Sequence, residues 1–441
     1  MSTRLKNIVK RYTPGFIMSL YHHIMAYRQS LIEAFYISQI QYRQRKALAR
    51  IGKKETIRCV FFATLGSSWQ YDSVYKALEK HPRFDPVVLI CPVVDFGIDN
   101  MIARMEECER LLNSKGFKVV KAYDVCSHQY INVRKELRPD LIFYTSPYKT
   151  LVGSKFYITN FMDILGVYVP YFINGSPLVS FSSDLLLHNL VWRKYAEYEN
   201  DKEIAIRYQR VHGRNVVLTG YPDIEKLIDE SYKPSSSEWK IQDRRVKRII
   251  WAPHHTLEKS PYGHTCFLLY CDFMIEMAQK YQHDIQIAFK PHPLLRNKLE
   301  LVWGKDRTDH YYSKWATMPN TILQEGDYVD LFLTSDAMIH DSGSFVFEYL
   351  FVNKPVMRTV YDVPLESQFN SLALSCLDQY YKCQTQEGIE QFIQNVINNV
   401  DPLKEQRTKF VKDILMPKGS PSQNILNDLL DSINNQILYR N

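Results

Sequence analysis

From Thr56 onward, short apolar runs alternate with longer amphipathic stretches, a pattern typical of βαβ units around a parallel sheet. In the first half it predicts strands over 58–64, 86–91, 117–120, 140–144, 166–172 and 215–219, with helices over 72–80, 98–115 and 128–137. In the second half it predicts strands over 248–251, 285–289, 321–323, 337–340 and 356–360, with helices over 267–281, 328–335, 344–351 and 387–399. The fold class predicted is therefore α/β, with two doubly wound sheets.

The boundary between the halves is predicted at Ser231–Lys240, which is polar, rich in turn-forming residues and followed by a basic run. We expect four parts, which are a basic helical arm over 1–54, one α/β domain over 55–230, a second over 240–415, and a closing helix over 416–441. Parallel sheets bind ligands at the carboxyl ends of their strands, so the loops that follow the strands are where a site is expected.

Charge is concentrated at the N-terminal end. Residues 1–54 hold eleven Lys and Arg against Glu33 alone, a charge of +10, whereas the whole chain carries +7 and the remainder therefore −3. Apolar and aromatic residues are interleaved with these charges at helical spacing, which suits the anionic inner face of a membrane. The alternative is a helical cap packed on the first domain. Nucleic-acid binding is not expected, because the body of the chain is not basic.

The remaining composition points to a cytosolic globular protein. Aromatic residues make up 13% of the chain, and no run of about 18 apolar residues or signal-peptide profile is present. The eight cysteines are scattered without a C-x-x-C pair, so we expect reduced core thiols and no disulfide framework or zinc site.

The stretch Ser335–Glu348 is the most informative segment, because an apolar strand ends in small and polar residues that open into a helix. Gly343 would let the main chain approach a ligand closely, while Ser342 and Ser344 offer hydroxyl groups. The first turn of a helix favours phosphate, and Glu348 follows where it can accept hydrogen bonds from a ribose. The alternative is an ordinary N-cap before a core helix.

Two histidine-containing loops follow strands in the same half. His292 lies between two prolines after Lys290, where a rigid imidazole can donate to a phosphate oxygen or assist a leaving group. His254 and His255 follow another strand, and we expect only one of these adjacent side chains to face the cleft. No acidic or cysteine cluster accompanies them, so no metal site is predicted.

In the first half, the turn Asn174-Gly175-Ser176-Pro177 and the loops 65–72 and 220–223 follow strands, and we expect them to line the acceptor side.

Together these segments resemble the CDP-glycerol glycerophosphotransferase family, the teichoic-acid primases and polymerases. The resemblance covers roughly residues 165–360 and rests on four short motifs in a fixed order, Thr219–Asp223, Ile250–Pro253, Lys290–Pro293 and Ser335–Glu348. It implies a GT-B-type fold, with an acceptor domain followed by a donor-nucleotide domain.

The resemblance also implies roles for residues of the second half. His292, Ser342 and Ser344 would hold the CDP pyrophosphate, with Glu348 or Asp341 near the ribose. An acceptor hydroxyl would attack the β-phosphate and release CMP, which requires positioning and charge stabilisation more than covalent chemistry. No cofactor is implied, although a loosely bound Mg²⁺ on the pyrophosphate is compatible with this chemistry.

The sequence departs from the family pattern at two turns. The family's His-Gly-Thr-Pro turn, whose histidine is the expected general base, is similar to Asn174–Pro177 here, and an asparagine cannot take a proton at neutral pH. The base could instead be His188, Asp72 or His255. The Tyr-Ser-Ser of the donor turn is replaced by Ser342–Ser344, which keeps its hydroxyls.

The sequence therefore predicts a peripheral membrane transferase on the cytoplasmic face. It would move a glycerol-phosphate or other polyol-phosphate unit from a CDP donor to a cell-surface glycan or lipid-linked acceptor, in teichoic-acid or capsule synthesis. Two alternatives remain, a glycosyltransferase that uses a UDP- or GDP-sugar, and a catalytically silent binding subunit prompted by Asn174.

Overall fold

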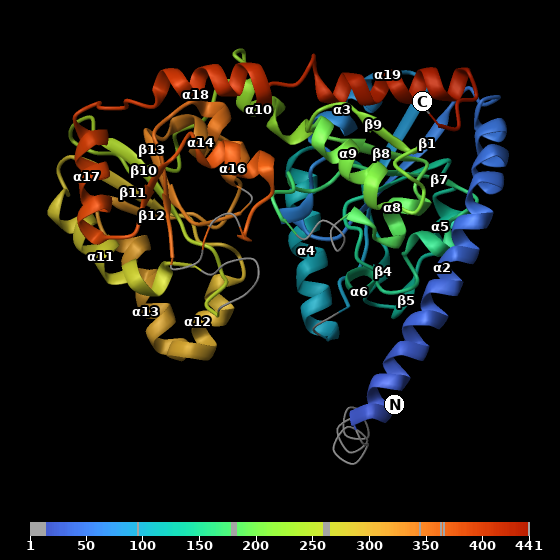
Figure 1. Cartoon of the computed structure of the whole chain (residues 1–441), viewed down its shortest axis with the longest axis horizontal. Helices are drawn as coiled ribbons and strands as arrows, with labels where there is room; N and C mark the ends of the chain where they lie inside the picture. The colour runs from blue at the N-terminus through green and yellow to red at the C-terminus, as the bar shows by residue number, and fades with distance from the viewer. Residues whose placement is uncertain are drawn as a thin grey trace.

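The computed structural model describes residues 15–94, 97–177, 183–258, 265–343, 345–361, 364 and 367–439. Two α/β units lie side by side, each built around its own parallel sheet (Figure 1). The first sheet has seven strands in the order β3-β2-β1-β6-β7-β8-β9, and the second has six in the order β12-β11-β10-β13-β14-β15. Every pair of neighbouring strands in both sheets is parallel, as the alternating sequence pattern predicts.

The strands of the first unit are β1 (Ile57–Ala63), β2 (Phe84–Ile90), β3 (Val119–Lys121), β6 (Leu141–Tyr144), β7 (Leu165–Tyr168), β8 (Arg193–Ala196) and β9 (Val216–Leu218), with a separate hairpin β4 (Tyr123–Asp124) and β5 (Gln129–Tyr130). Its helices are α2 (Gly15–Ile51), α3 (Asp72–Lys80), α4 (Ile98–Ser114), α5 (Val133–Glu136), α6 (Lys149–Val152), α8 (Leu186–Leu190), α9 (Glu199–Tyr208) and α10 (Glu225–Ile228).

The strands of the second unit are β10 (Lys247–Ala252), β11 (Ile285–Phe289), β12 (Thr321–Leu323), β13 (Ala337–His340), β14 (Val356–Thr359) and β15 (Tyr381–Cys383). The helices that follow β10 are α11 (Phe267–Lys280), α12 (Leu295–Trp303), α13 (Lys305–Thr317), α14 (Val329–Thr334), α15 (Phe345–Glu348), α16 (Ser371–Leu377), α17 (Gln386–Ile397), α18 (Lys404–Phe410) and α19 (Pro421–Asn434).

Most predicted elements are confirmed within a few residues, and β11, β12, β13 and α3 match residue for residue. The helix predicted over 128–137 is wrong, because this segment forms strand β5 and then the one-turn α5, whose N-cap Asn132 accepts a hydrogen bond from the main-chain N–H of Lys135. Strand β8 was not predicted, because the charged residues Arg193 and Lys194 interrupt the apolar pattern, although all four residues of the strand are buried.

Aromatic packing holds the second sheet where its central strands end. The rings of Trp251 on β10 and Phe289 on β11 lie 5.1 Å apart, and both pack on Trp315 of α13 at 5.4 and 5.1 Å. Large rings buried together stabilise the fold both by their area and by their tilted contacts. The loops that follow β10 and β11 therefore start from a rigid base.

Helix α2 is packed at one end and exposed at the other. Ile40, Ala47, Leu48 and Ile51 are buried against the first unit, whereas the earlier turns extend away from it (Figure 1). The helical prediction for 1–54 is thus confirmed for Gly15–Ile51, and the cap alternative holds for its second half. Among the described residues, no helix is long and apolar enough to cross a membrane.

The eight cysteines are all free thiols, in agreement with the sequence. Six are buried, but Cys126 is exposed and Cys383 is partly exposed, so the expectation that all are core thiols is wrong for these two.

The C-terminal helix α19 returns to the first unit and packs against α3 (Figure 1). A buried ion pair fastens it there, because Arg193 Nε donates to Asp428 Oδ2 at 3.0 Å and Tyr195 Oη donates to the same oxygen at 2.8 Å. The other guanidinium N–H groups of Arg193 donate to Ser432 Oγ and to the carbonyl oxygens of Trp192, directly before β8, and of Ile437 and Leu438, after α19. The side chains of Arg193 and Asp428 are 0% and 5% exposed.

We expect Asp428→Asn to lower the free energy of unfolding by about 3 kcal/mol, because it leaves a buried guanidinium without its counter-charge. Urea unfolding followed by tryptophan fluorescence would measure the change. The matched control is Asp163→Asn, which breaks the exposed pair with Arg134 and should cost less than about 1 kcal/mol. Equal losses for the two variants would contradict this role of the Asp428 pair.

Candidate active site

Three loops meet at the carboxyl ends of β10, β11 and β13. The main-chain N–H of His292 donates to the carbonyl oxygen of Pro253 at 3.1 Å, which joins the loops after β11 and β10. The Asp341 carboxylate accepts from the main-chain N–H of His254 at 2.6 Å, and from Thr265 Oγ1 and the N–H of Cys266 at 2.7 and 2.6 Å. Both Asp341 oxygens therefore hold the loop after β10 and the start of α11, which gives Asp341 a structural role besides the predicted position near the ribose.

The side chains of His254, His255 and His292 form a cluster at this junction. The ring centroids of His255 and His292 lie 4.1 Å apart, those of His254 and His292 5.1 Å, and those of His254 and His255 4.2 Å. The expectation that only one of the two adjacent histidines could turn toward the site is wrong. One nitrogen from each ring lies within 4.8 Å of the others, so this cluster has the ligand type and spacing to hold a metal ion.

Burial keeps all three imidazoles neutral. It lowers the pKa of His254 to about 2, of His292 to about 3 and of His255 to about 4, with the positive charge of Lys298 on α12 adding to each shift. His292 Nδ1 accepts from the main-chain N–H of Leu294 at 3.1 Å. The neutral ring therefore has its proton on Nε2, which is a hydrogen-bond donor toward the cluster.

Two further cations border the three loops. Arg358 of β14 is buried and donates to the carbonyl oxygens of Ser342 and Asp341 at 3.0 and 3.1 Å, so it lies directly beneath the predicted phosphate turn. Lys290 is also buried, but its Nζ donates to the carbonyl oxygen of Gly326 at 2.7 Å. Burial lowers the pKa of Lys290 to about 8, despite the nearby charges of Asp327, Glu238 and Glu325.

The predicted phosphate turn begins where expected, directly after β13. Ser342 is buried, and a Cβ added to Gly343 would meet no described atom within 4 Å, so the main chain is open on that side. Ser344 lies outside the described residues. The helix that follows is short, since α15 gives way after Glu348 to a 3₁₀ turn over Tyr349–Val352.

Glu348 lies in a buried carboxyl pair between the two units. Asp223, in the turn after β9, accepts from Tyr328 Oη at 3.2 Å, and Glu348 Oε2 is buried with no hydrogen-bond partner among the described residues. Burial, followed by the charge of Asp223, raises the pKa of Glu348 to about 8. Burial, followed by the charges of Asp72 and Asp327, raises the pKa of Asp223 to about 7. Glu348 is therefore mainly protonated at neutral pH and can both donate to and accept from a hydroxyl group.

The Asn174–Gly175 turn of the first unit contacts α15 and α16. Asn370 at the start of α16 donates through Nδ2 to the carbonyl oxygen of Asn174 at 2.7 Å, and its N–H donates to the carbonyl oxygen of Gly175 at 2.8 Å. A Cβ at Gly175 would approach Ala373 and Phe347 to 3.1 and 3.2 Å. The turn at Asn174, where the family pattern has its general base, therefore packs directly against α15, the helix that follows the phosphate turn.

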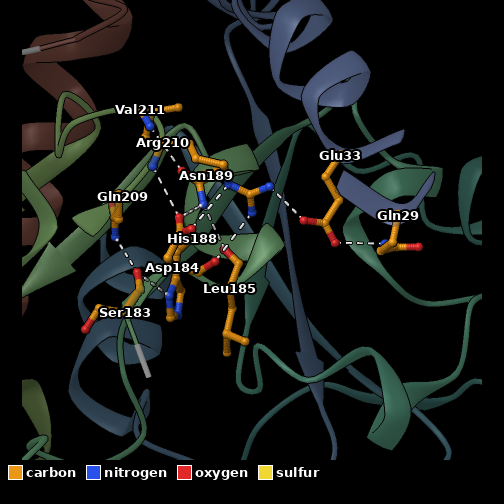
Figure 2. A network of polar contacts seen from close by, with 10 residues as sticks. All are labelled: Gln29, Glu33, Ser183, Asp184, Leu185, His188, Asn189, Gln209, Arg210 and Val211. Atoms are coloured by element: carbon orange, nitrogen blue, oxygen red, sulfur yellow. Dashed lines mark hydrogen bonds and ion pairs between the residues drawn. The ribbon is translucent and has the colours of Figure 1, made fainter. Parts of the chain in front are cut away.

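His188 on α8 is separate from the histidine cluster and belongs to the first unit. Figure 2 shows its Nδ1 beside the carbonyl oxygen of Ser183, at 3.1 Å, where Gln209 also donates. In the same view Arg210 links Asp184 to Glu33 of α2. The loop before α8 is thus held by both α2 and the segment after α9.

Sequence reasoning found the three loops and the histidines but not the groups around them. Lys298 and Arg358 lie within an ordinary helix and an ordinary strand, and neither position is marked by a loop or a turn. The coupling of Asp223, Tyr328 and Glu348 joins residues from three distant segments, and no sequence pattern marks it. Asp72 is also placed by the structure away from a catalytic role, since it pairs with Lys115 and Lys226 at 2.9 and 3.0 Å.

The chain is similar to known proteins over much of its length. A family model for CDP-glycerol:poly(glycerophosphate) glycerophosphotransferase matches residues 194–412, about half of the chain. The chain belongs to this family. The glycerophosphotransferase match begins at β8 and includes the histidine cluster, Asp223 and Glu348. The resemblance drawn from the four short motifs is thereby confirmed.

Two curated relatives of this glycerophosphotransferase family member are the teichoic acid ribitol-phosphate polymerases TarK and TarL of Staphylococcus aureus. They are 23% and 24% identical over 196 residues, which is 43% of this chain and 35% and 32% of the relatives. The match thus spans about a third of the length of the curated relatives.

Solved structures share the fold. A variant of the wall teichoic acid polymerase TagF is similar over 94% of this chain and 99% of that chain, at 15% identity and a TM-score of 0.55. The MnaA–UDP structure from S. aureus is similar over 88% of this chain and 99% of that chain, at 16% identity and a TM-score of 0.55. The UDP-GlcNAc 2-epimerase of Neisseria meningitidis bound to UDP-GlcNAc matches 85% of this chain and 99% of that chain, at 14% identity and a TM-score of 0.54. The GT-B-type fold predicted from the sequence is confirmed.

The Glu348 carboxyl gives a pH test of the site. Its pKa is about 8 in the folded chain against an ordinary 4.5, so between these values the folded protein holds a proton that the unfolded chain has lost. Stability should therefore fall as the pH rises from about 5 to about 8, and Glu348→Gln should make this fall smaller. Thermal unfolding across that range measures it, with Glu387→Gln on exposed α17 as the control. Parallel curves for wild type and Glu348→Gln would refute the assignment.

Proposed function

We propose that this protein transfers a glycerol-phosphate or other polyol-phosphate unit from a CDP-activated donor to a cell-surface glycan or lipid-linked acceptor, with release of CMP. Membership of the glycerophosphotransferase family supports the reaction class. The observation that carries the proposal is the histidine cluster, in which the main-chain contact from Leu294 leaves Nε2 of His292 as a fixed donor.

The cluster suits a pyrophosphate because neutral imidazoles and buried cations combine there. His292 would donate to a phosphate oxygen, while Arg358 and Lys298 provide positive charge at the edge of the cluster. Asp341 offsets part of the charge of Arg358. Charge that develops on the departing CMP is stabilised more strongly in a water-poor site than in bulk solvent. Glu348, neutral and partly unsatisfied, would bond to the ribose hydroxyls.

A sugar nucleotide is the second candidate for the donor. The chain shares its fold with structures bound to UDP and UDP-GlcNAc, and a ribose carboxyl would serve either donor equally. A thermal-shift panel of CDP, UDP and GDP separates the two, because only the cognate base should raise the unfolding temperature at low concentration.

Release of CMP is the direct test. Wild-type protein should release CMP from CDP-glycerol or CDP-ribitol in the presence of a lipid-linked acceptor, and His292→Ala should lower kcat/KM by about 100-fold or more, as loss of one transition-state donor does. His310→Ala, on the exposed face of α13, is the matched control and should retain activity. Absence of CMP release from any CDP-polyol, or full activity of His292→Ala, would overturn the proposal.

The proposal includes attachment of the protein to the inner face of the membrane through α2. Ile24, Tyr27, Leu31 and Phe35 recur at helical spacing and are 56%, 68%, 54% and 60% exposed, which is unusual for large apolar residues on an otherwise polar surface. Arg28 lies among them and further cations follow. An apolar stripe with a cationic border fits an anionic lipid surface.

Cosedimentation with vesicles tests this attachment. Wild-type protein should bind vesicles that contain about a third phosphatidylglycerol more tightly than neutral ones, because the arm is basic. Leu31→Ser with Phe35→Ser should weaken binding about tenfold or more, since each removes apolar area from the interface. Leu268→Ser with Leu269→Ser, exposed residues of α11, forms the control. If the Leu31→Ser, Phe35→Ser variant bound the vesicles as tightly as wild type, the apolar stripe of α2 would not be the membrane-binding surface.

A further inference from the structure

Three arginines are buried in the part of the chain that the structure describes, and one of them has no acidic partner. Arg193 pairs with Asp428 at 3.0 Å. Arg407 pairs with Asp401 at 2.5 Å. Arg358 of β14 is 5% exposed, forms no ion pair with a carboxylate of any described residue, and has a buried Nε without a hydrogen-bond partner among them. A buried charge is costly unless an opposite charge compensates it, so Arg358 lacks what the other two arginines have.

The carboxylate of Asp341 offsets only part of this charge. Burial lowers the pKa of Arg358, and the negative charge of Asp341 opposes this shift without reversing it. The same carboxylate accepts three hydrogen bonds, from the N–H groups of His254 and Cys266 and from Thr265 Oγ1. Burial in turn raises the pKa of the Asp341 carboxyl, so its negative charge is also disfavoured there. The phosphate turn therefore lies beside positive charge that a bound anion would balance.

The guanidinium of Arg358 holds two successive peptide groups of the phosphate turn. It donates to the carbonyl oxygen of Asp341 at 3.1 Å and to that of Ser342 at 3.0 Å. A trans peptide group is planar, with its C=O and N–H on opposite sides, so the N–H groups of Ser342 and Gly343 point away from Arg358. The central carbon of the guanidinium lies 4.7 Å from the ring centroid of Phe369, a contact that restricts the arginine further.

This arrangement carries the charge of Arg358 through the main chain. A cation at the oxygen end of a peptide group and an anion at its N–H end both align with the peptide dipole, and hydrogen bonds in such a chain strengthen one another. Helix α15 has only four residues, so it contributes little of the dipole that longer helices offer to phosphate. The positive potential at the turn therefore depends on Arg358.

The phosphate turn and the histidine cluster are joined through Asp341. Its carbonyl oxygen accepts from Arg358, and its carboxylate accepts from the main-chain N–H of His254 at 2.6 Å. Burial, the two neighbouring imidazoles and then the charge of Arg358 lower the pKa of His254, which places the guanidinium close to the cluster as well. A phosphate bound at the turn would thus share one site with the histidines.

We propose that Arg358 is a positioning residue for the donor, and that the donor phosphate supplies the counter-charge that the protein's own side chains do not. The guanidinium orients the peptide groups of the turn toward that phosphate and makes no contact with it. The inference rests on the proposed function, because it takes the turn to hold the donor. It adds that affinity for the phosphates of the nucleotide depends on Arg358, whereas affinity for the nucleoside does not.

The first experiment measures the binding of CDP by calorimetry and of cytidine by ligand-observed NMR. Arg358→Met keeps an unbranched side chain but removes the charge and both donors, so the Kd for CDP should rise by about tenfold or more. The Kd for cytidine should change by less than about twofold. An unchanged Kd for CDP, or equal losses for CDP and cytidine, would overturn the proposal, because a merely structural arginine would not distinguish the two ligands.

The matched control is Arg407→Met, which removes a buried arginine of the same unit that pairs with Asp401. It should leave the Kd for CDP within about twofold of wild type, and thermal unfolding verifies that each variant is folded. Arg358→Lys keeps the charge and so tests the proposal even where Arg358→Met does not fold. A single ammonium cannot hold both carbonyls as the planar guanidinium does, so CDP should bind about threefold or more weakly. Wild-type affinity in Arg358→Lys would overturn the positioning role.

A second nucleotide separates this inference from the proposed function. If wild type binds UDP in place of CDP, and Arg358→Met weakens the binding of UDP, the CDP-dependent reaction fails and the role of Arg358 stands. If wild type releases CMP from a CDP-polyol but binds CDP no more tightly than Arg358→Met does, the reaction stands and the role of Arg358 fails.

Discussion

The close approach of the Asn174–Gly175 turn to Asn370 and Phe347 is the constraint on which the arrangement of the site depends. Two main-chain carbonyls are fixed by one asparagine, and the absence of a side chain at Gly175 lets the units touch. Even one added carbon would require the neighbours to move, and packed interiors resist such movement. Loops that are more than a hundred residues apart in the sequence are thereby brought to a shared cleft.

Burial then determines what each side of the cleft can do. Burial lowers the pKa of His254, His255 and His292 and raises the pKa of Glu348, so all four side chains are mainly uncharged at neutral pH. These groups therefore differ in whether they donate or accept hydrogen bonds and not in their charge. The positive charge beside the phosphate turn comes from Arg358, whose guanidinium donates hydrogen bonds to the carbonyl oxygens of Asp341 and Ser342. A site of this kind is pre-organised, because its dipoles are oriented by main-chain contacts before any ligand arrives.

The sequence predicted the features that depend on neighbouring residues in the chain. It did not predict those that depend on contacts between distant segments. Periodicity located β11, β12 and β13 because each is a short apolar run between turns, and the loops after them followed from parallel topology. The family resemblance implied Glu348 or Asp341 near the ribose, but it could not reveal the three donors from other segments that bond to the Asp341 carboxylate. Periodicity missed β8 because Arg193 is paired with Asp428 of α19, more than two hundred residues away, a partner that it cannot reveal.

The return of α19 to the first unit has a mechanical consequence. The chain passes between the units twice, once after α10 and once before α19, and the second passage starts from a π-helical turn over Val411–Leu415. Because two separate stretches of chain join the units, the distance to which the units can part is limited by both connections. The second connection is also fastened at its far end, since Asp428 of α19 pairs with Arg193 of β8 inside the first unit.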